Sequence, residues 1–275
     1  MPEVVAEHID RLCTVEMRSH GNLPRGVTGI LYQSARSARG GKPLTLLAAM
    51  ALQERLAPGG RVFFVTGAGG PPHVPHGETD GPLGVVSLAR ALSLGLSITP
   101  VFVLEERHIP PTVAAAAAGG LSVAASPPGG TGHRMALLAP FPTGADNGQR
   151  AAVRLVSEHQ PQAVIFVEKL GPNHQGVVHS VSGYPRDPNA IGAASFLADE
   201  ARARGVLTIA VGDNGNEIGF GVIADVVRSV LPHGRRCRCP CASGIACVSE
   251  ADVLVVSSIS NWGAYGIAAC LGYLM

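Results

Sequence analysis

Short apolar runs alternate with helical segments along this chain, and this alternation constrains the fold more than any other feature. The runs predict buried strands at residues 61–66, 97–104, 134–139, 163–167, 206–211 and 253–257. Helices are predicted between and after them, at 82–94, 111–118, 145–159, 188–204, 223–230 and 263–274. Strands separated by helices of this length are typical of βαβ units with parallel strands. We therefore predict an α/β fold of three layers, with a mainly parallel sheet and helices on both faces.

Three further helices are predicted ahead of the first strand, at 3–18, 25–38 and 44–56. Pro24 and Pro43 stand where the second and third of these helices begin, a position that proline tolerates well. The segment 117–133 is rich in Gly, Ser, Ala and Pro, and it is the only stretch that would tolerate a domain boundary. We therefore expect one domain over residues 1–275.

The composition excludes several classes of protein. An apolar content of 46% with 15% charged residues supplies a sizeable core and argues against disorder. The net charge of +1 and an aromatic content of 4% do not indicate a surface that binds nucleic acid. No apolar run approaches the roughly 18 residues that a membrane span needs, and the acidic amino terminus resembles no signal peptide. We expect a cytoplasmic protein that binds a small molecule and neither nucleic acid nor membrane. The sequence does not decide whether the protein forms a homo-oligomer.

Polar motifs follow four of the predicted strands directly. In chain order they are GAGGPPHVPHGETDG after 61–66, EKLGPNH after 163–167, GDNGNE after 206–211 and SNWG after 253–257. The carboxyl ends of parallel strands meet at one edge of a sheet, where ligands bind in open α/β folds. We therefore expect the four motifs to form one site.

The side chains that these motifs bring are acids and amides. They are Glu78, Asp80, Glu168, Asp213, Asn216, Glu217 and Asn261, with Lys169 as the nearest cation and His73, His76 and His174 in the same loops. Such a set suits an ammonium group or a hard divalent cation bound through oxygen. Crowded carboxylates also raise one another's pKa, which makes a general acid or base usable near neutral pH. The alternative for Asp80 and Asp213 is that each caps the helix after its turn.

Nucleotide-binding and serine-hydrolase motifs are missing from the sequence. Gly67-Ala68-Gly69-Gly70 is followed by prolines that prevent a helix from starting there, so it is no dinucleotide fingerprint. Neither a G-x-x-x-x-G-K-[ST] loop nor a G-x-S-x-G elbow occurs. We expect no nucleotide cofactor.

Four of the six cysteines, Cys237, Cys239, Cys241 and Cys247, cluster in RRCRCPCASGIAC. Their C-x-C-x-C-x5-C spacing differs from the paired C-x2-C of familiar zinc sites. On an extended segment, thiols two residues apart would also point to opposite faces. The sequence therefore favours free thiols over a metal site here, in keeping with a reducing compartment.

Four segments together resemble the signatures of the D-glutamate cyclase carboxyl-terminal domain, in the same order and over nearly the whole chain. They are GETDGP at 77–82, VEKLGPNHQG at 167–176, GDNGNEIGFG at 212–221 and SNWGAY at 260–265. Asn214 and Phe220 stand where this family more usually has Gly and Met. The resemblance implies an α/β lyase that converts D-glutamate into 5-oxo-D-proline with loss of water. Vertebrate members carry a further amino-terminal domain and a mitochondrial address, so we expect a free-standing bacterial type here.

Given this resemblance, each motif residue receives an expected role. We expect Glu78, Glu168, Asp213 and Glu217 to be catalytic, and Asp80, Lys169, Asn216 and Asn261 to bind substrate. If Mg²⁺ or Mn²⁺ is present, we expect it among Glu78, Asp80, Asp213 and Glu217 rather than at the cysteines. Two alternatives remain: a sensor of acidic amino acids without turnover, and a lyase or hydrolase acting on a different lactam or carboxylate.

Overall fold

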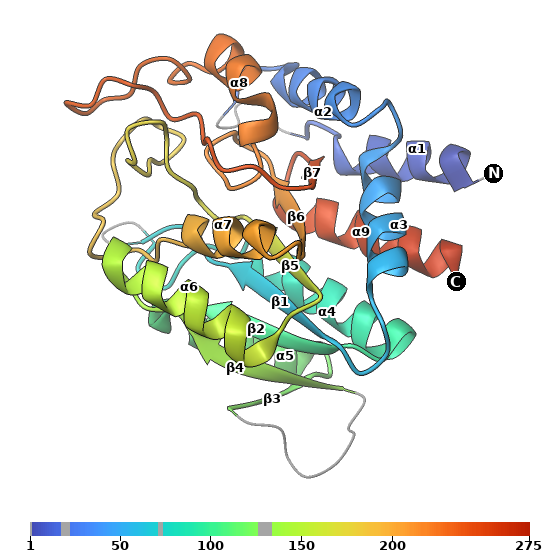
Figure 1. The fold of residues 1–275 in the computed structure, drawn as a ribbon. Coiled ribbons are helices and arrows are strands. Elements are labelled where there is room, and N and C mark those ends of the chain that lie inside the picture. Colours follow the sequence, from blue (N-terminus) through green and yellow to red (C-terminus); the bar gives the residue numbers. More distant parts are fainter. Residues whose placement is uncertain (1, 18–22, 71–73, 126–133) are drawn as a thin grey trace.

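The computed structural model describes residues 2–17, 23–70, 74–125 and 134–275, and it is built on one seven-stranded sheet (Figure 1). The strands lie in the order β3-β4-β2-β1-β5-β6-β7, and every neighbouring pair is parallel. Their bounds are β1 Arg61–Thr66, β2 Thr99–Leu104, β3 Ser122–Ala124, β4 Met135–Pro140, β5 Ala163–Val167, β6 Leu207–Gly212 and β7 Val253–Val256. The predicted parallel sheet is confirmed.

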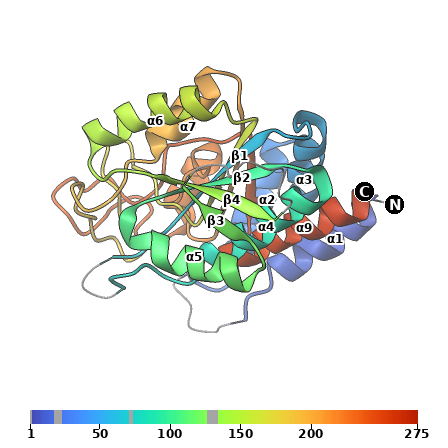
Figure 2. The ribbon, with the colours of Figure 1, turned by 90° about the horizontal axis from the view of Figure 1, so that it is seen from below.

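Helices cover both faces of this sheet. The α-helices are α1 Pro2–Cys13, α2 Val27–Ala38, α3 Leu44–Arg55, α4 Pro82–Leu96, α5 Ile109–Ala118, α6 Ala145–His159, α7 Ser195–Ala203, α8 Ala224–Val230 and α9 Ser260–Leu274. Seen from below, α6 and α7 lie on one side of the strands, and α4, α5 and α9 lie on the other (Figure 2). The three-layer α/β arrangement is therefore as expected.

Several predicted elements have different bounds in the structure. The first helix ends at Cys13, and the last begins at Ser260, so the SNWG motif forms its first turn rather than a loop. The helix predicted over 188–204 is shorter and begins at Ser195. Before it, the backbone bonds to another segment instead of to its own next turn, since Gly144 N donates to Ile191 O at 3.0 Å. Strand β3 falls within the segment 117–133, whose residues 126–133 lie outside the described part.

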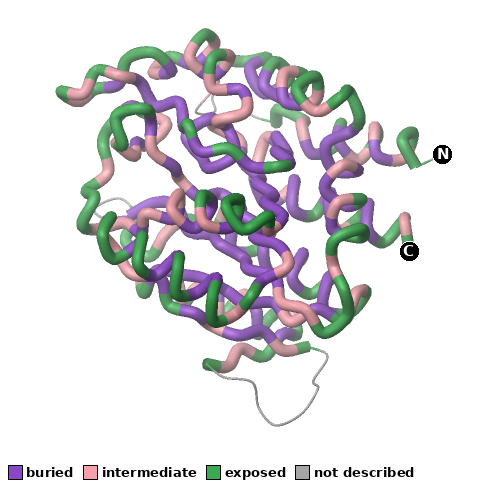
Figure 3. Tube along the Cα trace, viewed as in Figure 1, coloured by how far each residue is buried: buried purple, intermediate pink, exposed green. Residues whose placement is uncertain are grey.

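The central strands are buried on both faces, which explains why they appear in the sequence as continuous apolar runs. Every residue of β5 and β6 is buried (Figure 3). Phe63, Phe64 and Phe102 fill the sheet core without exposure. Burying one such side chain contributes roughly 1.5–3 kcal/mol, so this layer is an important source of stability for the fold.

The chain adds strands first on one side of β1 and then on the other. From β1 the chain moves outward through α4 to β2 and on to β4, and α6 then carries it back across the opposite face to β5 on the other side of β1. A switch of this kind opens a crevice beyond the carboxyl ends of the two strands where the reversal occurs. The fold therefore places the loops after β1 and β5 at its natural ligand-binding position.

Candidate functional site

The four polar motifs meet because the strands that precede them end in line. Thr66 at the end of β1 pairs with Val167 of β5, Val167 pairs with Val211 of β6, and Gly212 pairs with Val256 of β7. A cleft of about 500 Å³ opens beyond these ends. Among the predicted site residues, those in its wall are Glu78, Asp80, Glu168, Asp213 and Asn261.

Three carboxylates form the centre of this cleft. One oxygen each of Asp80, Glu168 and Asp213 lies within 4.8 Å of the other two. Burial, followed by the negative charges of the neighbouring acids, raises the pKa of Glu168 well above its ordinary value, and the same causes raise that of Asp213. Ser260 Oγ donates to Glu168 at 2.6 Å. Three acids buried together in this way favour a bound proton or a bound cation over three free negative charges.

Asp80 and Asn261 tie the amino termini of α4 and α9 to each other. Asp80 accepts the backbone N–H groups of Ser260 at 3.0 Å and Asn261 at 2.7 Å, at the start of α9. Asn261 Oδ1 in turn accepts those of Gly81 at 2.9 Å and Gly84 at 2.6 Å, at the start of α4. Each side chain therefore caps the other helix, and Asp80 also accepts the N–H of Gly81 at 3.0 Å, so it contributes to the cap of the helix that follows its own turn. Burial raises the pKa of Asp80 against the lowering effect of these hydrogen bonds.

Gly81 allows the loop after β1 to cross closely over the strand ends. Its φ is +97°, and a Cβ there would clash with Thr66 Oγ1 and lie 3.0 Å from Glu168 Cβ. Glu168 itself has a φ of +49°, a left-handed conformation that costs free energy in a residue other than glycine. Backbone strain thus concentrates where the carboxylates meet.

The side chain of Glu217 stabilises the GDNGNE turn through hydrogen bonds to its backbone. Glu217 Oε1 accepts the backbone N–H of Asn214 at 2.9 Å, and Asn214 Nδ2 donates to the carboxylate of Asp213. Glu217 Oε2 is buried and has no hydrogen-bond partner within the described part of the chain. Asn216 points away from the cleft and donates to His179 O at 2.9 Å. Glu217 and Asn216 therefore hold the turn that presents Asp213, and neither lies in the cleft wall.

Lys169 lies outside the cleft, although the sequence suggested it as a substrate-binding residue. Its ammonium is buried, forms an ion pair with Glu105 and donates to Gly67 O at 3.2 Å. Glu105 follows β2 directly, and its buried carboxylate holds the Lys169 ammonium outside the cleft. No sequence motif marks Glu105 as its partner.

Two arginines, which no motif singled out, supply positive charge instead, one in the cleft wall and one that acts on Glu78 without lining the cleft. Arg25 is exposed and lies in the cleft wall, just before α2. The charge of Arg186 opposes the rise in the pKa of Glu78, which burial and then Asp80 and Glu217 cause. Among the histidines of these loops, His73 lies outside the described residues, and His76 and His174 are exposed.

Comparison with known proteins identifies the family of this chain. The family model described as D-glutamate cyclase-like, C-terminal, matches residues 13–275. The chain belongs to this family. A stretch of 76 residues is also 40% identical to the human mitochondrial D-glutamate cyclase. That stretch is 28% of this chain and only 11% of the human protein, so the chain matches a small part of this relative's length.

Solved structures offer only remote likenesses. A UDP-GlcNAc 2-epimerase from Neisseria meningitidis has a TM-score of 0.34 at 7% identity, over 62% of this chain and 42% of the epimerase. The trehalose-6-phosphate phosphatase N-terminal domain of Candida albicans has a TM-score of 0.33 at 9% identity, over 91% of this chain and 42% of that one. No helix within the described ranges is both long and apolar enough to cross a membrane.

Proposed function

We propose that this chain is a lyase that interconverts D-glutamate and 5-oxo-D-proline, with loss of water in the direction of ring closure. The observation that carries the proposal is the group of three carboxylates, Asp80, Glu168 and Asp213, at the carboxyl ends of β1, β5 and β6. Membership of the D-glutamate cyclase-like family supports the choice of reaction.

The cleft offers partners for both kinds of charge on an acidic amino acid. The substrate ammonium would lie among the three carboxylates, where it would offset the negative charges that, after burial, raise the pKa values of Glu168 and Asp213. The substrate carboxylates would face Arg25 in the cleft wall, on the side where the charge of Arg186 also acts on Glu78. In this arrangement the amino group and the γ-carboxyl are held close together in a folded conformer.

Ring closure moves two protons from the substrate nitrogen to the oxygen that leaves as water. Asp213, in its ionised form, would accept the first proton from the ammonium, and the freed amine would attack the γ-carboxyl carbon to form the C–N bond. Glu168, whose raised pKa favours its protonated form, would donate a proton to the leaving oxygen and then take back the second proton from the ring nitrogen. Asp213 would pass its proton to the same oxygen, so the C–O bond breaks, water leaves and both acids return to their starting forms. Because the attack is intramolecular, correct positioning could supply several kcal/mol, up to about 7–11, of the barrier.

The same carboxylates fit a hard divalent cation such as Mg²⁺ or Mn²⁺. Asp80, Glu168 and Asp213 come from three separate elements and offer only oxygen ligands, as such ions prefer. This set differs from the sequence expectation, since Glu168 replaces Glu217, whose Oε1 is occupied by backbone N–H groups. Glu78 stands in the cleft wall but outside the group of three. A bound ion would supply Lewis-acid polarisation of the γ-carboxyl.

A time course with purified protein tests the proposal. D-glutamate, L-glutamate and both enantiomers of 5-oxoproline are incubated separately, with and without Mg²⁺ or Mn²⁺, and the products are separated by chiral chromatography. We expect turnover of the D-series, and loss of at least about 100-fold in kcat for Glu168→Gln and Asp213→Asn, since each removes a proton carrier. Asp225→Asn, on the exposed side of α8, is the matched control and should keep full activity.

Two outcomes would overturn the proposal. Binding of glutamate by calorimetry without any product would indicate a sensor. Full activity of both Glu168→Gln and Asp213→Asn would show that the three carboxylates only shape the fold.

A further inference from the structure

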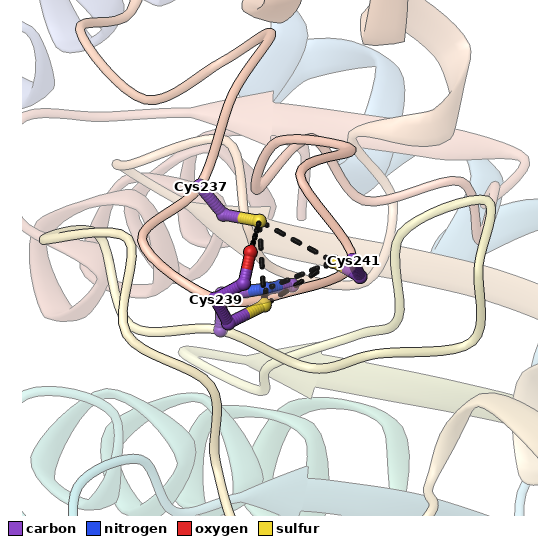
Figure 4. Close-up of side chains that lie close together, drawn as sticks. Cys237, Cys239 and Cys241 are labelled. Atoms are coloured by element: carbon purple, nitrogen blue, oxygen red, sulfur yellow. Dashed lines mark hydrogen bonds between the residues drawn. The ribbon is translucent and has the colours of Figure 1, made fainter.

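A second group of metal-ligand side chains lies apart from the acidic cleft. Cys237, Cys239 and Cys241 turn their side chains toward a common centre (Figure 4). His179, from the loop after β5 and 60 residues before Cys239, brings its Nε2 atom to the same place. The three sulfurs and this nitrogen all lie within 4.8 Å of one another.

The distances among these atoms are close to those of a tetrahedral site. The sulfur–sulfur distances are 3.4 Å for Cys237–Cys239 and 3.3 Å for Cys237–Cys241 and Cys239–Cys241. His179 Nε2 is 3.2 Å from Cys239 Sγ and 3.7 Å from Cys241 Sγ. Zinc bonds of about 2.3 Å to sulfur and about 2.0–2.1 Å to nitrogen give tetrahedral edges of roughly 3.8 and 3.6 Å. The measured edges lie within about half an ångström of these values.

The surroundings of His179 fix its ring in the form that a metal needs. The ring is fully buried, and Nδ1 lies 3.0 Å from Val177 O. An Nδ1–H that donates to this carbonyl leaves the lone pair of Nε2 directed at the three sulfurs. Metal-binding histidines are typically oriented by such a hydrogen bond from the other ring nitrogen.

The chain around the cluster consists of two long segments without regular structure. Residues 168–194 and 231–252 contain no helix or strand, although both are described throughout. Loops of this length in a compact domain need a specific source of order. One contact between them besides the cluster is Asn173, whose Nδ2 donates to Gly244 O at 2.7 Å. A metal at the cluster would cross-link the two segments.

We propose that His179, Cys237, Cys239 and Cys241 bind one structural Zn²⁺. Three thiolates and one imidazole in a tetrahedral arrangement favour zinc over Mg²⁺ or Mn²⁺. All four positions are filled by protein ligands, which is the property of a structural site and leaves no place for a substrate.

The sequence argument against a metal here depended on an extended chain and on Cys247 as the fourth ligand. Instead, residues 237–241 turn, so alternate thiols face one way. Cys247 is fully buried away from the cluster, where its sulfur accepts from Ser249 N at 3.4 Å. The fourth ligand is a histidine that is distant in the sequence.

The zinc site would also support the GDNGNE turn. Asn216 of that turn donates to the backbone carbonyl of His179, and the backbone N–H of Gly171 donates to Asn216 O at 2.9 Å. Holding His179 in place therefore holds the underside of the turn that presents Asp213.

Metal analysis of the full chain, purified without chelator, tests this proposal directly. We expect about one zinc per chain in the wild type and loss of that zinc in Cys239→Ser and Cys241→Ser. Replacing the ion with Co²⁺ should give the intense visible spectrum of a tetrahedral thiolate site. Cys247→Ala is the matched control and should keep the zinc, because its sulfur lies outside the cluster.

Proteolysis supplies a readout that does not depend on activity. Arg235, Arg236 and Arg238 are exposed trypsin sites within or beside the cysteine segment. Removal of zinc should raise the rate of cleavage there at least about tenfold, as the loops lose their cross-link. Wild-type protein without zinc that also gains none on addition of Zn²⁺, while all three thiols react freely in the native state, would overturn the proposal. So would zinc that persists in both serine variants.

Discussion

Replacing Glu168 by Gln should stabilise the protein at neutral and alkaline pH while it removes activity. Glu168 is buried, and ionising it brings a charge next to those of Glu217, Asp80 and Glu78. Its pKa is therefore higher in the folded state than the ordinary value of about 4.3 in the unfolded chain. The favourable contribution of the protonated group is fully present below the unfolded pKa, and it is lost as the pH rises through the folded pKa.

The size of this effect follows from proton linkage. Between the two pKa values the folded state holds about one more proton than the unfolded state. The free energy of unfolding then falls by about 1.4 kcal/mol per pH unit on account of this one group. The amide of the Glu168→Gln variant would carry no charge, and its carbonyl could still accept the hydrogen bond that Ser260 Oγ now donates at 2.6 Å. In the variant, the free energy of unfolding should therefore lose the part of its pH dependence that Glu168 causes, with little other change.

Urea unfolding of both proteins from about pH 5 to pH 8, with chelator present, measures the difference. We expect the two free energies to separate in favour of Glu168→Gln as the pH rises, and each kcal/mol to correspond to about 2–4 °C in Tm for a domain of this size. Saturating Mg²⁺ or Mn²⁺ should reduce the advantage, because an ion bound by the carboxylates stabilises only the wild type fully. Parallel curves without any ion would refute the claim that Glu168 ionises at a cost.

Three further predictions concern the parts that hold the cleft together. Gly81→Ala should destabilise the fold by more than the about 1–2 kcal/mol that a left-handed backbone costs alone; Gly176→Ala, which has a φ of +75° but open space around it, isolates that cost in the same thermal melts. Asn261→Ala should cost about 1–3 kcal/mol for each N–H left unpaired, chiefly that of Gly84, and equal melting temperatures would contradict the capping role. Arg25→Gln should raise KM for glutamate with little change in kcat, and an unchanged KM would remove Arg25 from the substrate contacts.

Much of the fold and part of the cleft could be predicted because both depend on local patterns. The continuous apolar runs marked β1, β5 and β6, and the parallel arrangement then placed Asp80, Glu168 and Asp213 at one edge. Glu168 and Asp213 come immediately after β5 and β6, so knowledge of the sheet was sufficient for them, whereas Asp80 stands 14 residues beyond β1 and also depends on its hydrogen bonds to the start of α9.

The remaining contacts join residues that no local pattern connects. The pairing of Lys169 with Glu105 depends on where the chain leaves β2, and the contribution of Arg25 depends on how α2 packs against the cleft. Cysteine spacing alone also could not reveal His179, because the ligand arrives from a different loop. Such contacts are decided by tertiary packing, which overrides the spacing of residues along the chain.

The exchange of caps between α4 and α9 determines when the site can exist during synthesis. Asp80 and Asn261, separated by 181 positions in the chain, must meet before either helix start is satisfied. Since α9 is the last helix of the described chain, a ribosome releases it after all the strands have been made. The nascent protein can therefore assemble the complete carboxylate cleft only after α9 has left the ribosome. A chain cut short ahead of α9 would lack the site even if its sheet formed.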